Sequence, residues 1–530
     1  MIDNSNKIIN FSEEARDLVK VGVDTLSAAV EVTMGPSGKN VLIEQLNDSP
    51  ILTKDGVTVA RAVHLRDRFA NMGVHLVREA AQRTAEEAGD GTTAATVLAA
   101  SIFHEGLKAL NAGHELNDIR SGIRSATLEL VRELKEKSSP IKSDKDLLRV
   151  ANISVNGEGD LAELIVDALK AVGETGVVTV DEAKGFESSL EVVDGCEVDR
   201  GYVSPYFINR PSRMCCELEN PAILITTQKI HLLSHIMHFL EEAASTGRSI
   251  VLISPETTGE ALQAIILNHS KNLIRACALA APEFGDARIE ALRDLSILLG
   301  CELLTDEPSS WKNYTLENLG RCDRLLAYRF RSVFIGAAGK EEDRQARIED
   351  ILSARKQHSD NTEVAAALDR RVRRMSSGIG ILRVGGATEA EIRERKDRVD
   401  DAIYATRAAI EEGIIPGGGS TVARIASTLL HDDSGIGEKI LYKAASAPLK
   451  QIAKNCGAVP EVILEKMLEK PASFGYNGIS NEICNLSRAG IVDPVKVVRL
   501  ALTNAASVAI NLLSIGCAMV SDEESQSNNG

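Results

Sequence analysis

A short glycine- and threonine-rich segment is the clearest sign of chemistry in this sequence. Residues 89–93 read Gly-Asp-Gly-Thr-Thr and stand directly before an alanine- and leucine-rich stretch typical of a helix. Glycines let a backbone approach a phosphate closely, and the free N–H groups at a helix start attract anions. The threonine hydroxyls add donors, and the Asp90 carboxylate could hold Mg²⁺ against phosphates. An ordinary helix N-cap without a ligand explains the same residues, and the local sequence alone slightly favours that interpretation.

Two further glycine turns are weaker candidates for a phosphate site. Residues 33–36 read Thr-Met-Gly-Pro, and residues 414–419 read Ile-Ile-Pro-Gly-Gly-Gly. Neither is a Walker loop, because the pattern G-x-x-x-x-G-K-[ST] does not occur in the chain. Each segment alone is more often a plain turn than a ligand cradle, so these turns carry information only in combination.

Acidic side chains could serve the same chemistry. A carboxylate can orient a water molecule for attack on a γ-phosphate. The candidates in loops or near helix ends are Asp55, Asp90, Asp401 and Asp493. A lone aspartate is usually a helix cap or a surface charge, so spacing does not select among the four.

The composition narrows the class of protein. The 530 residues include 60 lysines and arginines against 76 aspartates and glutamates, which gives a net charge of −16. This acidic balance argues against a nucleic-acid partner, and an aromatic content of only 3% argues against platforms for base stacking. No apolar run approaches the ~20 residues of a membrane span, so we also expect no membrane partner.

The cysteines and the N-terminus indicate a compartment. The nine cysteines are an odd number and form no C-x-x-C pair. Reduced thiols are therefore the expected state, rather than a disulfide framework or a metal site. The first residues contain no apolar signal core. Together these features predict a cytoplasmic protein.

The hydrophobic periodicity predicts an α, then α/β, then α order along the chain. The first and last thirds read as helices, with a break or kink expected at Pro448, and a charged segment near residues 340–374 reads as long solvated helices. The expected helices are 13–32, 71–83, 94–107, 400–412, 443–454 and 494–513. The β-branched runs of the middle third, expected as strands, are 176–180, 222–226 and 249–253. The polar tail 521–530 is expected to be disordered.

Taken together, the loops resemble the bacterial GroEL-type (group I) chaperonin family. The matching segments run in family order with nearly constant spacing over almost the whole chain, so the ordered set is far more specific than any one of them. They are Thr33-Met-Gly-Pro-Ser-Gly-Lys-Asn-Val41, Thr53-Lys-Asp-Gly-Val57, Asn71-Met-Gly73, Gly89-Asp-Gly-Thr-Thr93, Asp199-Arg-Gly-Tyr-Val-Ser-Pro-Tyr-Phe207, Phe284-Gly-Asp286, Ala405-Thr-Arg-Ala-Ala409, Glu411-Glu-Gly413, Gly417-Gly-Gly419, Gly475-Tyr-Asn477 and Val492-Asp-Pro494.

The resemblance implies a multidomain α and α/β protein with the GroEL-like chaperonin fold. A mainly α-helical equatorial domain, residues 1–136 and 411–530, would bind ATP and assemble the ring. A small α/β intermediate domain, residues 137–193 and 379–410, would act as the hinge. An α/β apical domain, residues 194–378, would bind non-native polypeptides and a GroES-like co-chaperonin. Members of the family usually form two stacked seven-membered rings.

The resemblance also implies a nucleotide site. Asp90 would coordinate Mg²⁺, Asp55 would help position the attacking water, and Asp401 would swing in as the catalytic carboxylate when the hinge closes. Hydrolysis would then be timed by domain motion. The implied cofactors are ATP and Mg²⁺, with K⁺ as a further candidate. The implied nucleotide-binding residues are Thr33, Met34, Gly35, Pro36, Lys54, Asp90, Gly91, Thr92, Thr93, Ala94, Gly418, Asn477, Gly478, Ile479 and Asp493.

The apical match implies a hydrophobic surface for unfolded polypeptides and the co-chaperonin. Two helices, about 232–244 and 260–268, would carry much of it, although the same residues could simply be apical core. Burial of apolar surface is non-directional, so such a surface need not read a sequence. The implied residues are Tyr202, Ser204, Tyr206, Phe207, Met237, Leu240, Glu241, Leu262, Ile266, Leu267 and Asn268.

Several positions depart from the family pattern. Ala94 stands where a third threonine is usual, and Gly478 and Ile479 replace a usual pair of alanines. Lys450 replaces an arginine, and residues 458–459 lack the common acidic side chains, which puts double-ring assembly in doubt. A divergent chaperonin paralogue, acting as a polypeptide-binding or scaffold protein with weak or no ATP cycling, is therefore the alternative. An unrelated nucleotide-using enzyme is a remote third interpretation.

One further alternative concerns metal. His231 and His235 could share a helix face at a spacing of four residues, but a zinc site needs three or four ligands and no third one is evident. Solvated helix-face histidines, able to titrate near pH 6.5, are the preferred interpretation.

Overall fold

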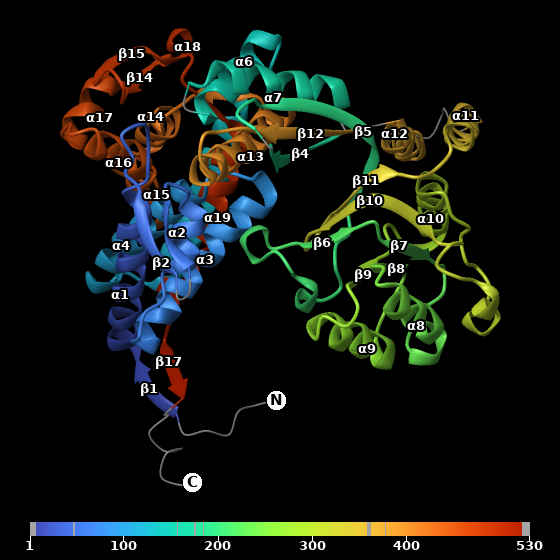
Figure 1. The fold of residues 1–530 in the computed structure, drawn as a ribbon. Coiled ribbons are helices and arrows are strands. Elements are labelled where there is room, and N and C mark those ends of the chain that lie inside the picture. Colours follow the sequence, from blue (N-terminus) through green and yellow to red (C-terminus); the bar gives the residue numbers. More distant parts are fainter. Residues whose placement is uncertain are drawn as a thin grey trace. The chain divides into compact units, whose positions relative to one another are not determined.

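The computed structural model describes residues 7–45, 48–155, 157–173, 176–183, 185–357, 362–376 and 378–521. The chain divides into two compact units: a helical unit, Met1–Val166 with Gly386–Gly530, and a sheet unit, Asp167–Gly385. Figure 1 shows the elements of both units. The division into three domains stays a prediction, and the predicted polar tail lies outside the described residues from residue 522 on.

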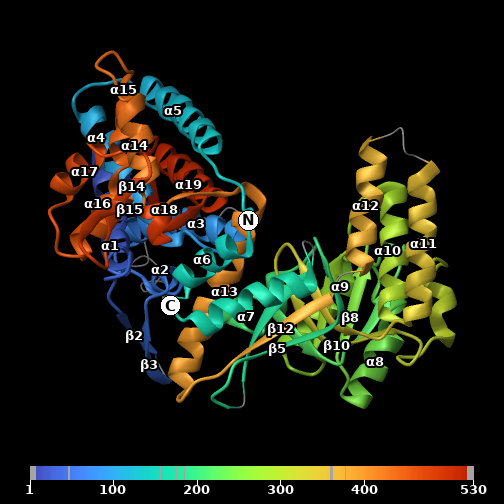
Figure 2. The ribbon, with the colours of Figure 1, turned by 90° about the horizontal axis from the view of Figure 1, so that it is seen from above.

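Long helices form the core of the helical unit. They are α1 (Ser12–Glu31), α3 (Arg68–Ala88), α4 (Thr92–Asn111), α5 (Leu116–Glu136) and α19 (Val495–Leu513). Helix α19 packs against α3, α4 and α5, and α1 packs against α3 and α4 (Figures 1 and 2). Their facing side chains are buried alanines, valines, leucines and isoleucines in one cluster. The helices expected from periodicity in both terminal thirds are therefore present.

Helix α19 is the one described helix long and apolar enough to cross a membrane by length and composition. Most of its apolar window, 61%, is buried inside the unit. Core helices of this kind pass the same test, so α19 is weak evidence for a membrane span.

Shorter elements complete the helical unit. Both chain ends contribute, because β1 (Lys7–Phe11) pairs antiparallel with β17 (Cys517–Ser521). The other strands are β2 (Val41–Gln45), β3 (Asp48–Thr53), β13 (Ile414–Pro416), β14 (Phe474–Asn477), β15 (Glu482–Asn485) and β16 (Val492–Pro494). The other helices are α2 (Gly56–Ala62), α6 (Asp144–Ser154), α7 (Gly159–Val172), which begins in this unit, α13 (Glu389–Glu412), α14 (Ser420–Leu429), α15 (Ile436–Ala444), α16 (Ala447–Asn455), α17 (Pro460–Leu468) and α18 (Leu486–Ala489).

The expected break at Pro448 is present. Helix α15 ends at Ala444, and α16 begins at Ala447 with Pro448 in its first turn. The first turn is where a missing backbone N–H costs least, so the proline starts a new helix rather than kinking an old one. Helix α13 is longer than expected and begins at Glu389, where Thr388 caps it by accepting from the Glu391 N–H.

The sheet unit is built on a mixed nine-stranded sheet in the order β4-β12-β5-β11-β10-β7-β8-β9, with β6 paired to β10. The strands are β4 (Val177–Glu182), β5 (Ser189–Val198), β6 (Cys216–Glu219), β7 (Ala222–Ile225), β8 (Ile250–Ser254), β9 (Ala276–Ala280), β10 (Gly320–Ala327), β11 (Ser332–Ala337) and β12 (Gly378–Val384). Strands β7, β8 and β9 are parallel, as the predicted α/β pattern requires. All nine cysteines are unpaired, as predicted.

Helices cover this sheet. They are α8 (Met237–Thr246), α9 (Gly259–Ser270), α10 (Gly285–Leu299), α11 (Glu341–Gln357) and α12 (Thr362–Ser376), with the short 3-10 turns η1 (Pro205–Phe207), η2 (Pro211–Arg213), η3 (Leu233–His235) and η4 (Pro308–Asn313). Helices α11 and α12 lie side by side (Figure 2). They are not solvated all round as expected, because Ile351 and Met375 are buried in the core of the unit.

Two glycines set the spacing between α1 and α3. A Cβ on Gly22 would lie 1.7 Å from the Ala70 carbonyl oxygen, and a Cβ on Gly73 would lie 2.1 Å from the Val19 carbonyl oxygen. Each helix thus presents a glycine to the backbone of the other, and the added methyl group of an alanine would push the two helices apart.

We therefore expect Gly22→Ala to lower the free energy of unfolding by about 1–3 kcal/mol, although alanine favours helix in isolation. Gly159→Ala is the matched control, because nothing lies within 4 Å of a Cβ at this helical position. Chemical denaturation of both variants provides the measurement. A Gly22→Ala protein as stable as Gly159→Ala would contradict the close crossing.

Candidate functional site

The glycine- and threonine-rich segment forms a sharp turn between α3 and α4. Gly89 ends α3 with φ 72°, and Gly91 precedes α4 with φ 88°, both in the left-handed region that glycine tolerates. No described side chain caps α4, and the Asp90 carboxylate accepts only the N–H of its neighbour Gly91. The N-cap interpretation of this segment is therefore wrong, and the first N–H groups of α4 stay free of a side-chain acceptor.

Asp55 is a helix cap. Its two carboxylate oxygens accept the N–H groups of Val57 and Thr58 at 2.9 and 2.8 Å, at the start of α2. The next residue, Gly56, lies against α4, because a Cβ there would be 2.3 Å from Thr93 Oγ1. The cap thus also fixes the Asp55 carboxylate beside the start of α4, in the orientation that its two hydrogen bonds impose.

Asp401 of α13 is held near these two aspartates although more than 300 residues separate it from them. Burial is the largest cause that raises the pKa of Asp401 well above its usual range, and the charges of Asp90 and Asp55 raise it further. Burial likewise raises the pKa of Asp90; the Gly91 N–H opposes this and the Asp55 charge adds to it. The three carboxylates therefore repel one another in a partly desolvated cluster.

Asp493 joins the cluster from β16. Burial raises its pKa, the N–H groups of Gly419 and Gly418 lower it, and the Asp90 charge raises it. Its strand pairs with β13, which leads into α14, and Asp493 Oδ2 accepts the Gly419 N–H at 3.3 Å. At Gly418 the backbone has φ 62°, and a Cβ would meet nothing closer than the Tyr476 carbonyl oxygen at 3.8 Å. The glycine turn thus stays open beside a carboxylate.

The turn at residues 33–36 packs on a different partner. Asn455 Nδ2 donates to the carbonyl oxygens of Glu31 and Met34 at 2.8 and 2.9 Å, and Gly35, with φ 79°, lies against Ile452. Pro36 contacts the β14–β15 turn, because a Cβ on Gly478 would lie 2.9 Å from its Cγ. Two predicted segments, 33–36 and 477–479, are therefore brought together by tertiary contacts.

The remaining predicted nucleotide residues differ in exposure. Thr33 and Thr92 are buried, and Ala94 packs partly against the helical core. Lys54 is exposed. Ile479 is 83% exposed at the tip of a turn in which Asn477 Oδ1 accepts the Ile479 and Ser480 N–H groups. This exposed apolar side chain, beside the 33–36 turn, can contact the apolar face of a ligand.

Two residues of this region were missed by sequence reasoning. Asn455 holds the 33–36 turn, and the Tyr404 ring lies on Gly89, where a Cβ would be 2.0 Å from Tyr404 Cγ. A helical asparagine and a helical tyrosine carry no local signal of such contacts. Only the doubled glycines around Asp90 indicate that something must approach that turn closely.

The predicted polypeptide-binding residues of the sheet unit divide by burial. Tyr202, Phe207 and Leu240 are buried in its core, and Ser204 is buried where it caps η1. In this structure these four side chains support a surface rather than line it. Exposed side chains are Tyr206, Met237, Glu241 and Leu267, whereas Leu262, Ile266 and Asn268 are half-buried.

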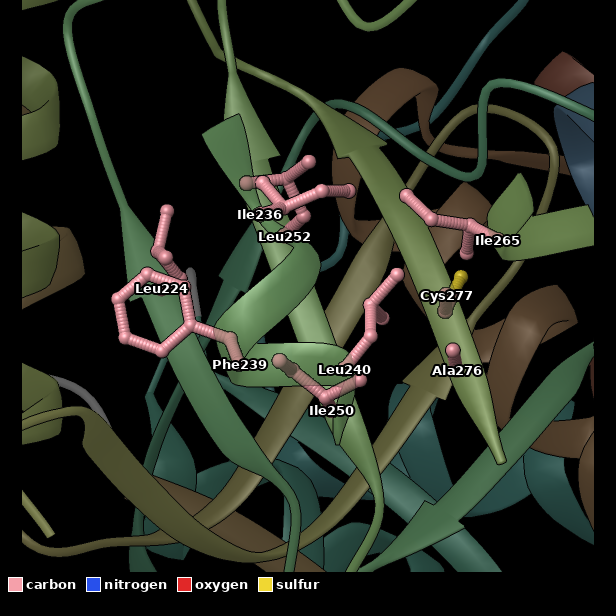
Figure 3. Close-up of a pocket in the computed structure, with 9 residues that line it drawn as sticks. All are labelled: Leu224, Ile236, Phe239, Leu240, Ile250, Leu252, Ile265, Ala276 and Cys277. Carbon is pink, nitrogen blue, oxygen red and sulfur yellow. The ribbon is translucent and has the colours of Figure 1, made fainter. Parts of the chain in front are cut away.

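Figure 3 shows why Leu240 is not exposed. Leu240 and Phe239 of α8 and Ile265 of α9 line a small apolar cavity of about 10 Å³ over the parallel strands, together with Leu224, Ile236, Ile250, Leu252, Ala276 and Cys277. The core interpretation weighed for the apical residues therefore holds at this position. The exposed apolar members of the predicted set, Tyr206, Met237 and Leu267, lie on η1, α8 and α9 respectively.

The histidines do not form a metal site among the described residues. Helix α8 begins only at Met237, and the short turn η3 is the helical part of the segment just before it. His231 therefore lies outside the helix that was predicted to begin near residue 232. Its Nδ1 contacts the Thr258 hydroxyl. Within the described part of the chain, no group of three or more histidine, cysteine or acidic side chains is placed to hold a metal ion. Mg²⁺ bound through one carboxylate and substrate phosphates needs no such group.

His269 ties the exposed elements of the sheet unit to its core. Its ring packs edge-on against Phe207 with centroids 5.7 Å apart, and its Nδ1 accepts the Ala276 N–H at 3.2 Å. Burial lowers the pKa of His269 more than its hydrogen bond with the Phe207 backbone raises it. The folded protein therefore holds this imidazole neutral, with Nδ1 as an acceptor.

The sign of the resulting pH dependence follows from the lowered pKa. The unfolded chain binds the proton more tightly, so stability present above pH ~6.5 is lost as the pH falls towards the folded-state pKa, by at most about 1.4 kcal/mol per pH unit. Between pH 7 and pH 5, we expect the thermal midpoint of the wild type to decrease more than that of His269→Asn, whose amide oxygen can take the place of Nδ1 and accept from Ala276. The exposed His431→Asn is the control. Parallel pH profiles of wild type and His269→Asn would contradict the assignment.

Comparison with known proteins completes these observations. The model of the TCP-1/cpn60 chaperonin family matches residues 26–523. Two crystal structures of the chaperonin gp146 from the bacteriophage EL 2 (Pseudomonas aeruginosa), both in the presence of ATP-BeFx, share the fold. Crystal form II has a TM-score of 0.71 at 22% identity and covers 97% of this chain and 100% of that one. Form I has a TM-score of 0.64 at 21% identity and covers 97% and 99%.

Proposed function

The chain belongs to the TCP-1/cpn60 chaperonin family and has the chaperonin fold, and from this premise we propose that it is an ATP-dependent chaperone that captures non-native polypeptides. Membership implies ATP-dependent assistance of protein folding in general. The observation that carries the finer proposal is the carboxylate cluster of Asp55, Asp90 and Asp401 beside the uncapped start of α4.

The start of α4 is suited to phosphates. Its first N–H groups have no side-chain acceptor among the described residues, and the helix dipole favours an anion there. The Gly418 turn is open beside Asp493, and the 33–36 and 477–479 turns meet at a separate place suited to the base end of ATP. These features support a nucleotide lying between the two groups of predicted residues.

The carboxylates fit a magnesium-dependent hydrolysis. Among the described residues Asp90 accepts one neighbouring N–H, so it keeps a carboxylate oxygen for Mg²⁺, which prefers one or two carboxylates and substrate phosphates. Bound Mg²⁺ would neutralise phosphate charge. Asp55 is oriented by its two cap bonds and can accept a hydrogen bond from a water molecule. Asp401, whose raised pKa makes it a stronger base, would accept the proton of that water.

The outer faces of the sheet unit support capture of polypeptides. Tyr206 is 71% exposed on η1, and Met237 and Leu267 are exposed on α8 and α9. These exposed side chains belong to elements whose other faces are buried in the core. Such a surface binds unfolded chains through burial and makes no demand on sequence. We propose the same surface as the binding site of a GroES-like co-chaperonin.

Self-association is supported by two small sheets of the helical unit. Leu42 of β2 and Leu52 of β3 are directly opposite one another and are 69% and 60% exposed. Ile8, Ile9 and Phe11 of β1 and Met519 of β17 are exposed as well. Within the described residues each sheet has only two strands, so both leave edges to pair with another chain. A ring of copies would cover these edges and apolar side chains.

The divergent paralogue with weak ATP cycling remains a second candidate because of two specific positions. Ala94 supplies no hydroxyl in the first turn of α4, a loss of about 1 kcal/mol if a hydroxyl there would bind phosphate. Ile479 places an exposed apolar side chain beside the 33–36 turn. Both affect nucleotide affinity rather than the carboxylate cluster.

Removal of the Asp401 carboxylate should abolish most of the ATP hydrolysis. We expect Mg²⁺-dependent ATP hydrolysis by the wild type and a rate at least ~100-fold lower in Asp401→Asn, because the proposed general base is removed. The same variant should unfold at an equal or higher temperature, because a repelled, desolvated charge is gone.

Thermal unfolding separates loss of the base from loss of the fold, and the exposed Asp433→Asn serves as a matched control in both assays. A wild-type rate of hydrolysis indistinguishable from that of Asp401→Asn would contradict the proposed function and favour the divergent paralogue with weak or no ATP cycling.

The second prediction concerns assembly. Leu42→Lys combined with Leu52→Lys should shift the solution mass from a multi-subunit particle towards a single subunit, because facing ammonium groups replace an apolar pair. Light scattering after size exclusion measures the mass. Leu128→Lys, at a position 73% exposed on α5, should leave it unchanged. If the wild type already runs as a single subunit, the ring proposal is wrong.

A further inference from the structure

Tyr404 makes a close contact with the turn that carries Asp90. A Cβ built on Gly89 would lie 2.0, 2.2 and 2.6 Å from Cγ, Cβ and Cδ1 of Tyr404. No atom can occupy that position, so the aromatic side chain takes the space where any other residue would carry its own side chain. Gly89 is therefore required twice, once for this contact and once for its φ of 72°.

The contact joins the two segments that carry Asp90 and Asp401 of the proposed hydrolysis site. Gly89 is bonded to Asp90, and Tyr404 follows Asp401 by about one helical turn on α13. The Tyr404 ring can set the distance between α13 and the turn closely, because an aromatic side chain has only two rotatable bonds and the helix fixes its direction.

Other contacts hold α13 farther from Asp401. Ala408, about two turns along, packs in a cluster with Ala88, Val497 and Leu500. Glu412, about three turns along, accepts hydrogen bonds from Arg499 Nε at 2.9 Å and Nη2 at 2.5 Å. These contacts place the C-terminal half of α13 on α3 and α19. The distance between Asp401 and Asp90 depends on contacts made by residues nearer to Asp401.

The Tyr404–Gly89 contact also opposes a separation of charges. Without a bound cation, Asp401, Asp90 and Asp55 repel one another, which favours movement of α13 away from the turn. Packing of the Tyr404 ring on Gly89 works in the opposite direction, three residues along α13 from Asp401.

We propose that Tyr404 is a positioning residue: its ring, seated on Gly89, sets how closely Asp401 approaches the Asp90 turn and so sets the rate of hydrolysis. This inference rests on the proposed ATPase function. It assigns no chemical role to the phenol hydroxyl, and it concerns the hydrolysis step rather than nucleotide binding.

Steady-state ATP hydrolysis by the full chain tests the proposal with Tyr404→Ala and Tyr404→Phe. Tyr404→Ala should lower kcat by about 10- to 100-fold, the cost of a misplacement near 1 Å, while KM changes by less than about twofold. Tyr404→Phe keeps the ring on Gly89 and should restore kcat to within about twofold of the wild type. A partly unfolded sample would also lower the apparent kcat at unchanged KM, so thermal unfolding measures the folded fraction of each variant and the rate is expressed per folded chain.

A double-mutant cycle tests the contact itself without activity. Gly89→Ala should lower the thermal midpoint more in the wild-type background than in Tyr404→Ala, because the overlap with the ring exists only in the former while the backbone strain exists in both. Equal losses in both backgrounds would overturn the contact.

The outcomes separate the two proposals. An active wild type, an inactive Asp401→Asn and a fully active Tyr404→Ala would overturn the positioning role and leave the proposed function intact. Equal losses of kcat in Tyr404→Ala and Tyr404→Phe would also overturn it, since the hydroxyl would then be the active part. A wild type without ATP hydrolysis would overturn the proposed function and the positioning role with it.

Discussion

Repulsion among half-buried carboxylates is the constraint that the proposed hydrolysis site must overcome. Burial and the charges of Asp90 and Asp55 raise the cost of ionising Asp401, and burial and the Asp55 charge do the same for Asp90. Such an arrangement is unstable by itself and persists only where the surrounding structure holds it. The contacts of α13 with α3 and α19, from the Tyr404 ring to the paired Arg499 and Glu412, provide that support. A cation bound among the carboxylates would reduce the repulsion, so we expect cation binding to favour the approach of Asp401 to the Asp90 turn.

The starts of α2 and α4 differ in how their backbone N–H groups are satisfied. Asp55 satisfies the first N–H groups of α2, yet the start of α4, which lies against it, has no side-chain cap among the described residues. One helix is completed internally, and its neighbour leaves donors that a ligand can use. Glycines at 89 and 91 make this possible, because only they follow the left-handed path that turns the chain without a capping side chain. The difference between a structural and a functional helix start is thus visible in adjacent segments.

The sheet unit resolves a related conflict between burial and exposure. Its 3-10 turn η1 and helices α8 and α9 bury Phe207, Leu240 and Ile265 against the sheet, while Tyr206, Met237 and Leu267 face outwards. A large apolar content on both faces would leave such helices without a fixed orientation. The His269 ring, wedged beside Phe207 and bonded to the β9 backbone, fixes which face is buried. The predicted binding set therefore contains both the surface and the layer beneath it.

The sequence by itself determined the elements of this protein, because the hydrophobic period and the positions of glycine and proline act within one element. The helices of both terminal thirds, the parallel strands of the middle third and the start of a new helix at Pro448 all follow from such local patterns. Local patterns did not decide the role of an aspartate: Asp55 is a cap, and Asp401 approaches Asp90 from a distant helix. Nor could they decide that Leu240 is core, or that Tyr404 fills the space beside Gly89. Burial, charge repulsion and close packing depend on which elements meet in space, and only the tertiary structure decides that.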